Sequence, residues 1–161
     1  MLLAVLALVF TLAVGCSSEP AGEETPEETG SEEGTETTEL EDGTYYAEDD
    51  AFSNGWKYNV TIVVEDGKIV DATWNGEAED GGDDKVTQST DGRYGMKEKG
   101  NASAEWHEQA ALAEAYLIEV QDPTAIEYTD DEGHTDAIAG ASIHVKEFFD
   151  LAQKALASDP S

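Results

Sequence analysis

The sequence predicts an α+β fold in which helices pack on one antiparallel sheet. Residues 43–74 carry strand patterns separated by turn signals, and residues 103–157 carry two stretches with the helical spacing of apolar residues. Strands that come first along the chain, followed by helices, are typical of this architecture. We therefore expect a single folded domain over residues 43–161.

The strands are expected near the start of this domain. Residues 43–47 favour a strand, and Asn54-Gly55 then indicates a turn. Apolar and polar residues alternate over residues 58–65, which is the period of a strand with one buried face. Asp66-Gly67 predicts a two-residue hairpin turn, because both turn positions need a positive φ. Residues 68–74 are expected to return as the partner strand, with Val70, Ala72 and Trp74 on one face.

A polar stretch and a helix are expected next. Residues 75–102 are rich in Gly, Asp, Asn and Ser and predict a loop with a short helical turn. Residues 103–120 predict a helix, which Asp122-Pro123 ends. Residues 124–128 predict a short strand, and residues 129–134 predict a polar turn. The apolar stripe of the helix consists of Trp106, Ala110, Ala113, Leu117 and Val120.

The last helix is expected to start near Ser142 or Ile143. Within residues 136–145 (DAIAGASIHV), the hydroxyl of Ser142 directly follows two very small residues, Gly140 and Ala141. Small residues let a bulky group approach the backbone, and the free N–H groups of a helix start favour a phosphate. The alternative is that Ser142 serves only as the N-cap of this helix. The buried face of the helix is expected to consist of Val145, Phe148, Phe149, Ala152 and Leu156.

The N-terminal residues predict an export signal. Residues 2–15 are almost wholly apolar, but they are too few to span a bilayer as a mature helix. Residues 12–18 (LAVGCSS) resemble the lipobox of a bacterial lipoprotein signal. That resemblance implies that residues 1–15 are removed and that lipidated Cys16 anchors the protein to the extracellular side of the cell membrane. An ordinary secretory signal with an incidental cysteine is the alternative.

Charge and cysteine content exclude several classes of function. Cys16 is the single cysteine, which excludes an intrachain disulfide and a thiolate metal cluster. Residues 16–42 are rich in Asp and Glu, lack Lys and Arg, and are expected to form a disordered, extended stalk after the lipidated cysteine. A specific acidic interaction tail is the alternative. The net charge of −29 repels nucleic acid, which is therefore not expected as a partner.

With these elements in place, residues 43–157 resemble the FMN-binding domain. That domain occurs in subunits of the sodium-pumping NADH:quinone oxidoreductase and of the Rnf complex, and in small lipoproteins of Gram-positive bacteria that act in extracellular electron transfer. Its attachment motif is an Asp, three residues, and Gly-Ala-Thr, which here becomes Asp136, residues 137–139 and Gly140-Ala141-Ser142. The resemblance also rests on Gly43-Thr44-Tyr45, Asp66-Gly67-Lys68-Ile69, Tyr94-Gly95-Met96 and Gln121-Asp122-Pro123.

The resemblance implies an electron carrier without a small-molecule substrate of its own. A flavin transferase would use FAD to leave FMN on Ser142 as a phosphoester, and Asp136 would belong to what that enzyme recognises. Redox donor and acceptor proteins or a quinone-linked electron source would be the other partners. Two alternatives stay open: a lipoprotein that binds FMN or another small ligand non-covalently, and a pheromone precursor that uses residues 8–15. The cofactor-binding residues implied are Asp136, Gly140, Ala141, Ser142, Ile143, Tyr94 and Met96.

The three histidines, two of the tryptophans and an acidic segment are the other residues for which the sequence indicates a position. His134 and His144 flank the motif and lie either near the flavin or in solvent, whereas His107 is expected at the surface. Trp74 and Trp106 are expected to pack in the core. Residues 79–84 predict a solvated acidic turn, because they lack the alternating ligand pattern of a calcium loop. No metal ligands are assigned from the sequence.

Overall fold

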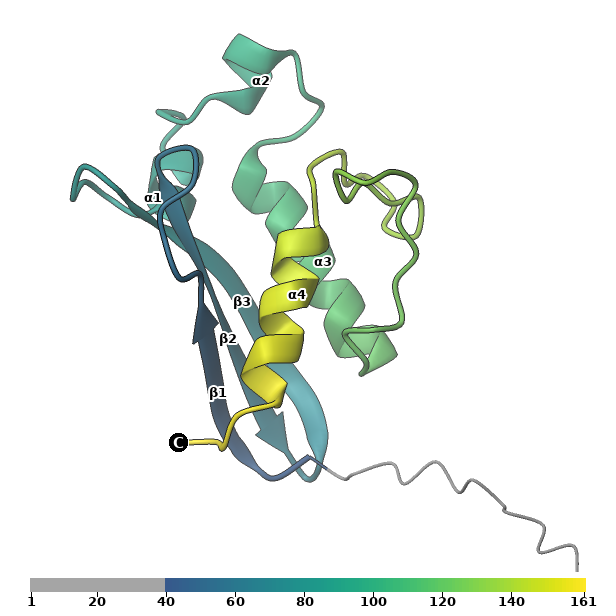
Figure 1. The fold of residues 1–161 in the computed structure, drawn as a ribbon. Coiled ribbons are helices and arrows are strands. Elements are labelled where there is room, and N and C mark those ends of the chain that lie inside the picture. The colour runs from purple at the N-terminus through teal and green to yellow at the C-terminus, as the bar shows by residue number, and fades with distance from the viewer. Residues whose placement is uncertain (1–39) are drawn as a thin grey trace, which may run out of the picture. The chain divides into compact units, whose positions relative to one another are not determined.

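The computed structural model describes residues 40–161, which form three strands and four helices (Figure 1). The strands form one antiparallel sheet in the order β1-β2-β3, so the predicted α+β class is confirmed. The predicted signal segment, Cys16, the pheromone segment and residues 16–39 of the stalk lie outside the described residues. The prediction of disorder is wrong for residues 40–42, because Leu40 packs against the core and Oδ1 of Asp42 accepts a hydrogen bond from the N–H of Gly67 (2.9 Å). None of the helices in the described part is long and apolar enough to cross a membrane.

The sheet consists of β1 (Gly43–Glu48), β2 (Trp56–Glu65) and β3 (Lys68–Ala78). The hairpin between β2 and β3 is confirmed, and both of its turn residues have a positive φ, 52° at Asp66 and 71° at Gly67.

A bulge in this hairpin changes which side chains face the core. Val64 pairs with Ile69, but Val63 pairs with Asp71, so Val70 is left without a partner on β2. The extra residue turns Ile69 inward and leaves Val70 44% exposed. The prediction that Val70 shares a face with Ala72 and Trp74 is therefore wrong, because Ala72 and Trp74 are buried in the core.

Two long helices cover one face of the sheet (Figure 1). Helix α3 (Trp106–Val120) packs on β3, and α4 (Lys146–Leu156) packs on β2 and β1. The predicted stripe of α3 is buried at Trp106, Ala110, Ala113 and Leu117. Together with the inward residues of the sheet and Phe148 and Phe149 of α4, these side chains form one continuous apolar core.

Side chains of α3 and of its C-terminal cap also form hydrogen bonds with backbone groups on the outer edge of β3. The backbone N–H of Ile69 donates to Oε1 of Gln121 (2.8 Å), and Nε2 of Gln121 donates to the carbonyl of Ile69 (2.8 Å). Further along the strand, the N–H of Trp74 donates to Oε1 of Glu114 (2.7 Å). Gln121 reaches this position because it ends α3 in the left-handed conformation, at a φ of 63°. Side chains of the helix thus bind backbone groups that a fourth strand would otherwise use.

The stretch expected to be a loop contains more regular structure than predicted. Strand β3 continues to Ala78, and two short helices follow, α1 (Lys85–Thr90) and α2 (Met96–Gly100). Helix α1 begins where the carboxylate of Asp84 accepts a hydrogen bond from the N–H of Thr87 (2.9 Å), which is ordinary N-capping. The prediction of a loop with one helical turn is therefore wrong for residues 75–78 and for these two helices.

Residues 121–145 contain less regular structure than predicted. The strand expected at residues 124–128 is absent from the described structure, and the segment is held by isolated bonds such as the one from Oγ1 of Thr135 to the carbonyl of Glu127 (2.7 Å). Helix α4 starts at Lys146, later than the predicted start near Ser142 or Ile143. The N–H of Val145 instead donates to the carbonyl of Gly133 (2.9 Å), which holds the preceding residues away from the helix.

Candidate functional site

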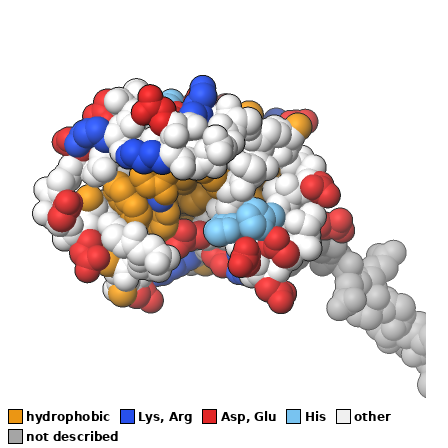
Figure 2. Space-filling view, turned by 90° about the horizontal axis from the view of Figure 1, so that it is seen from above, with side chains coloured by type: hydrophobic (Ala, Val, Ile, Leu, Met, Phe, Trp, Pro, Cys, Tyr) orange, Lys and Arg blue, Asp and Glu red, His pale blue; other side chains and the backbone are white. Residues whose placement is uncertain are grey.

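A hollow of about 260 Å³ lies at the end of the domain where α1, α2, the start of α3 and the residues before α4 meet. Figure 2 looks down on this end and shows hydrophobic side chains gathered in a hollow with histidines beside it. We call this hollow the aromatic pocket. It is lined by Tyr58, Trp74, Lys85, Tyr94, Met96, Trp106, Ser142, Ile143, His144 and Glu147.

Ser142 lies at the exposed rim of the aromatic pocket and is held there by Gln109 of α3. Oε1 of Gln109 accepts hydrogen bonds from both the backbone N–H (2.7 Å) and the hydroxyl (3.0 Å) of Ser142. Nε2 of Gln109 donates to the carbonyl of Ala104 (3.0 Å), so the orientation of this amide is fixed by its environment. Gln109 is fully buried, whereas Ser142 is exposed. A rigid core residue therefore positions an accessible hydroxyl.

Lys85 carries a positive charge into the aromatic side of the pocket. Its side chain is 2% exposed, and Nζ donates a hydrogen bond to the hydroxyl of Tyr58. Burial lowers the pKa of Lys85 to about 8, although the negative charge of Glu147 acts in the opposite direction. Nζ lies 4.5–5.0 Å from the ring centroids of Tyr58, Tyr94, Trp56 and Trp106, which is cation–π range.

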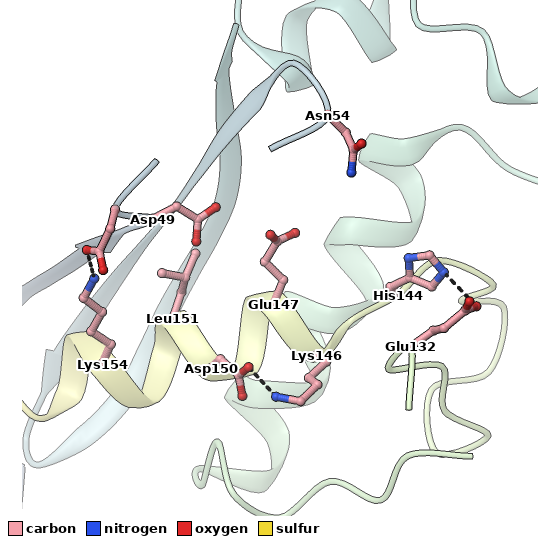
Figure 3. Close-up of a pocket in the computed structure, with 10 residues that line it drawn as sticks. Asp49, Asn54, Glu132, His144, Lys146, Glu147, Asp150, Leu151 and Lys154 are labelled. Atoms are coloured by element: carbon pink, nitrogen blue, oxygen red, sulfur yellow. Dashed lines mark hydrogen bonds and ion pairs between the residues drawn. The ribbon is translucent and has the colours of Figure 1, made fainter. Parts of the chain in front are cut away.

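Glu147 connects the aromatic pocket with a second, polar hollow of about 530 Å³. Figure 3 shows Glu147 rising from α4 into this hollow, Asp150 paired with Lys146 along the helix, and His144 and Glu132 at the far side. Burial raises the pKa of Glu147 to about 7, and the neighbouring charge of Asp49 adds to the rise. His144 also lines both hollows, so the two form adjoining parts of one surface depression.

The structure brings four of the seven residues implied by the resemblance into the aromatic pocket: Ser142, Ile143, Tyr94 and Met96. The other three do not line it. Asp136 and Gly140 are exposed outside the pocket, and Ala141 packs against the core. Gly140 has a φ of 90°, so it forms a left-handed turn that directs the chain toward Ser142.

The start of the last helix does not lie where the sequence predicted, so it cannot support a phosphate on Ser142 as expected. The N-cap of α4 is Val145, so Ser142 is not a helix cap. The backbone N–H groups of Ser142 and Val145 are already bonded to Gln109 and to Gly133. A phosphate on Ser142 therefore gains no support from a helix that starts at Ser142.

Lys85, Gln109, Tyr58 and Glu147 were not found from the sequence. Lys85 lies in a polar segment that reads as loop, and Glu147 lies between the apolar positions of a helix, where solvent exposure is the ordinary expectation. The one sequence signal for burial of Gln109 is its position directly before Ala110 of the apolar stripe. Its burial depends on the approach of Ser142, which no local pattern encodes.

The pocket fits a planar aromatic ligand with a phosphate tail. Aromatic walls can stack on such a ring, and Lys85 supplies a cation beside it. The indole Nε1 of Trp74, a residue of the pocket wall, is buried and has no hydrogen-bond acceptor within residues 40–161. The hydroxyl of Ser142 stands at the rim, where a phosphate would reach it.

Comparisons with known proteins agree with this geometry. The family model of the FMN-binding domain matches residues 54–157. A solution NMR structure of a protein from Clostridium thermocellum has 61% sequence identity and a TM-score of 0.59, and covers 76% of this chain and 95% of its own. A crystal structure of a protein from Clostridium perfringens has 27% identity and a TM-score of 0.56, and covers 73% of this chain and 87% of its own. The comparison with curated proteins finds no significant match.

The matched residues include all four helices, β2, β3 and every residue that lines the aromatic pocket. Because the model spans more than half of the chain and the pocket fits the cofactor, the chain belongs to the FMN-binding domain family and is a flavin-binding protein whose cofactor is FMN.

Proposed function

We propose that this protein carries FMN through a phosphoester on Ser142 and passes electrons between redox partners. The single observation that carries the proposal is the position of the Ser142 hydroxyl. It is exposed at the rim of a pocket with aromatic walls, and Gln109 fixes it there. The motif resemblance supports the same residue, since Ser142 stands where the motif Asp, three residues, Gly-Ala-Thr has its threonine.

Attachment requires a flavin transferase as partner. In the balanced step, Oγ of Ser142 forms a bond to the phosphorus of the FMN half of FAD. The pyrophosphate bond of FAD breaks, AMP leaves, and the hydroxyl proton is released. Gln109 supports this step because its Oε1 holds the backbone and the hydroxyl of Ser142 in one place before the bond forms.

Once bound, the flavin supplies the redox chemistry, while the protein sets its environment. Tyr94, which is partly exposed in the pocket wall, would stack on the ring and exclude water from one side. The ammonium of Lys85 favours negative charge on its neighbour, and the reduced form of a flavin carries more negative charge than the oxidised form. Glu147, with a pKa of about 7, can hold or release a proton at the pocket at neutral pH.

The cellular setting belongs to the same proposal. Lipidated Cys16 would hold the protein on the outer face of the cell membrane, and the acidic residues before Leu40 would act as a flexible tether. The domain would then reach donors and acceptors without leaving the membrane. A covalent bond to the cofactor suits this setting, because a dissociated flavin would be lost outside the cell.

The test is co-expression of the full chain with a flavin transferase. The expected result is a mass increase of one FMN on the peptide that contains Ser142, and flavin fluorescence that survives a denaturing gel. Ser142→Thr keeps the hydroxyl and should retain the flavin, whereas Ser142→Ala should lose all of it. Wild-type protein that releases its FMN on denaturation would refute the phosphoester and support the non-covalent alternative.

A further inference from the structure

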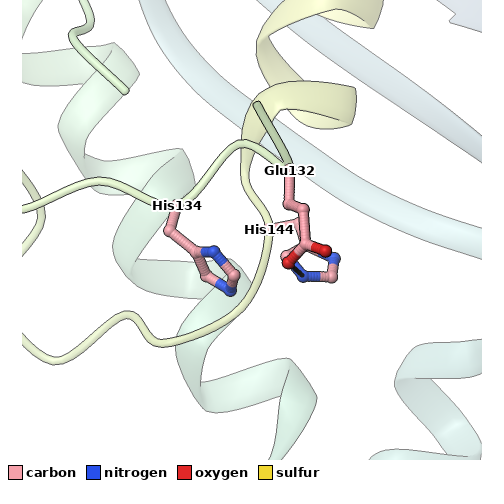
Figure 4. A group of neighbouring side chains, drawn as sticks. All are labelled: Glu132, His134 and His144. Carbon is pink, nitrogen blue, oxygen red and sulfur yellow. Dashed lines mark ion pairs between the residues drawn. The ribbon is translucent and has the colours of Figure 1, made fainter. Parts of the chain in front are cut away.

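We propose that Glu132, His134 and His144 bind a divalent transition-metal ion of the Zn²⁺ class. One ligand atom from each of these three residues lies within 4.8 Å of the other two (Figure 4). The site lies beside the aromatic pocket and is separate from the attachment residue. It uses two of the three histidines in the chain, in a sequence that is otherwise dominated by carboxylates.

The backbone brings these residues together from two segments. Glu132 and His134 flank Gly133, and His144 lies just before α4. The hydrogen bond from the N–H of Val145 to the carbonyl of Gly133 (2.9 Å) joins the two segments next to the site. Gly133 has a φ of 93°, and a Cβ at this position would collide with the side chain of Lys146. A glycine is therefore required for the close approach that places the two imidazoles 4.4 Å apart, measured between ring centroids.

Asp130 orients one of the proposed ligands. Its Oδ2 lies 2.6 Å from Nδ1 of His134, and its Oδ1 accepts from the backbone N–H groups of Gly133 (2.9 Å) and His134 (3.1 Å). A carboxylate on Nδ1 keeps the proton there and leaves the lone pair of Nε2 for a metal. The same carboxylate–histidine arrangement orients metal-binding histidines in general, so Asp130 is a positioning residue for His134.

The ligand set selects the class of metal. Oε2 of Glu132 lies 3.7 Å from Nε2 of His144. Tetrahedral Zn²⁺ with bonds of about 2.0–2.1 Å holds its ligand atoms roughly 3.3 Å apart, so small side-chain rotations complete the site. Two imidazoles and one carboxylate match Zn²⁺ with one coordination position left for water or another ligand. Mg²⁺ and Ca²⁺ prefer oxygen ligands only and are expected to bind the many carboxylates diffusely.

The experiment is a calorimetric titration of Zn²⁺ into the flavin-free full chain, with excess Mg²⁺ present to occupy diffuse carboxylate sites. We expect one site per chain. His134→Ala and His144→Ala should each weaken it by at least about 10-fold, and Asp130→Asn should weaken it by about 10–100-fold. His107→Ala is the matched control and should leave the affinity unchanged, because His107 lies on α3, next to Ser89.

Imidazole resonances in NMR spectra give a second readout that does not depend on the folding of any variant. Zn²⁺ should shift the ring signals of His134 and His144 and leave those of His107 in place. Unshifted signals of His134 and His144, or an equal loss of affinity in His107→Ala, would overturn the proposal. Since the protein is tested without flavin, failure here would leave attachment at Ser142 untouched, and failure of attachment would leave this site untouched.

Discussion

The two ends of the domain bury different kinds of side chain. At the end that carries the hairpin turn, the core consists of aliphatic residues such as Val64, Ile69 and Leu117. At the other end, the interior holds the charge of Lys85, and the half-buried carboxyl of Glu147 lies at the edge of the pocket. Apolar burial stabilises the fold, whereas burial of an unpaired charge opposes it. The contrast indicates that the hairpin end supplies stability and that the pocket end gives up some of it for binding.

The sharpest test of the hairpin end compares two neighbouring residues. Ile69→Ala removes a side chain that is 2% exposed and should reduce the free energy of unfolding by about 2–5 kcal/mol. Val70→Ala, at the bulge, should change it by less than about 0.5 kcal/mol, because this side chain is 44% exposed and lies outside the core. Urea unfolding of both variants measures the difference, and flavin attachment should be normal in each. Equal losses would show that the bulge does not set which residue faces inward.

The second test removes the buried cation at the pocket end. Lys85→Met should raise the free energy of unfolding by about 1–3 kcal/mol below pH 8, because a buried charge is replaced by an apolar chain of similar length. The pKa of Lys85 is lowered from 10.5 to about 8, so the charge opposes folding fully below pH 8 and ceases to do so as pH rises toward 10.5. The advantage of the variant should shrink over that interval.

Lys97→Met serves as the control for this test, since Lys97 is exposed on α2. In flavin-loaded protein, Lys85→Met should also lower the midpoint potential, because the cation that favours the reduced form is gone. A variant less stable than the wild type at pH 7 would show that the bonds of Lys85 with Tyr58 and the surrounding rings outweigh its burial.

The smallest expected effect concerns Glu147. Burial and the charge of Asp49 raise its pKa from 4.5 to about 7. Ionisation therefore opposes folding above pH 7, and this opposition vanishes as pH falls below 4.5, where the group is protonated in both states. Glu147→Gln should increase stability by about 1 kcal/mol at pH 8, after allowance for partial solvent screening, and by nothing at pH 4. Thermal unfolding at the two pH values measures this, with exposed Glu98→Gln as the control.

The sequence predicted the hairpin end well and the pocket end only in part. Alternation of apolar residues and the Asp66-Gly67 turn are local signals, and they specified the paired strands β2 and β3. Helix α3 followed from its apolar stripe for the same reason. The motif also identified Ser142 as the residue of interest, and the structure places it at a pocket together with Tyr94 and Met96.

The rest depends on contacts between residues that are far apart in sequence. Gln109 and Ser142 are 33 positions apart, and Tyr58 and Lys85 are 27 apart. The start of α4 depends on the hydrogen bond from the N–H of Val145 to the carbonyl of Gly133. Rules for helix capping consider only neighbouring residues and do not include this contact. The β-bulge at Val70 likewise shifts the inward face of β3 without a glycine to mark it. Each of these features is decided by packing in three dimensions, which a pattern along the chain does not contain.

The side chains of Gln121 and Glu114 along β3 hinder association of the protein at high concentration. An open strand edge invites a second copy to add its own strand, which is a common route to aggregation. Here a second copy would first have to displace hydrogen bonds of 2.7–2.8 Å at Ile69 and Trp74. Crowded copies of this domain are therefore protected from sheet growth along β3 by the same helix that holds Ser142 at the rim of the aromatic pocket.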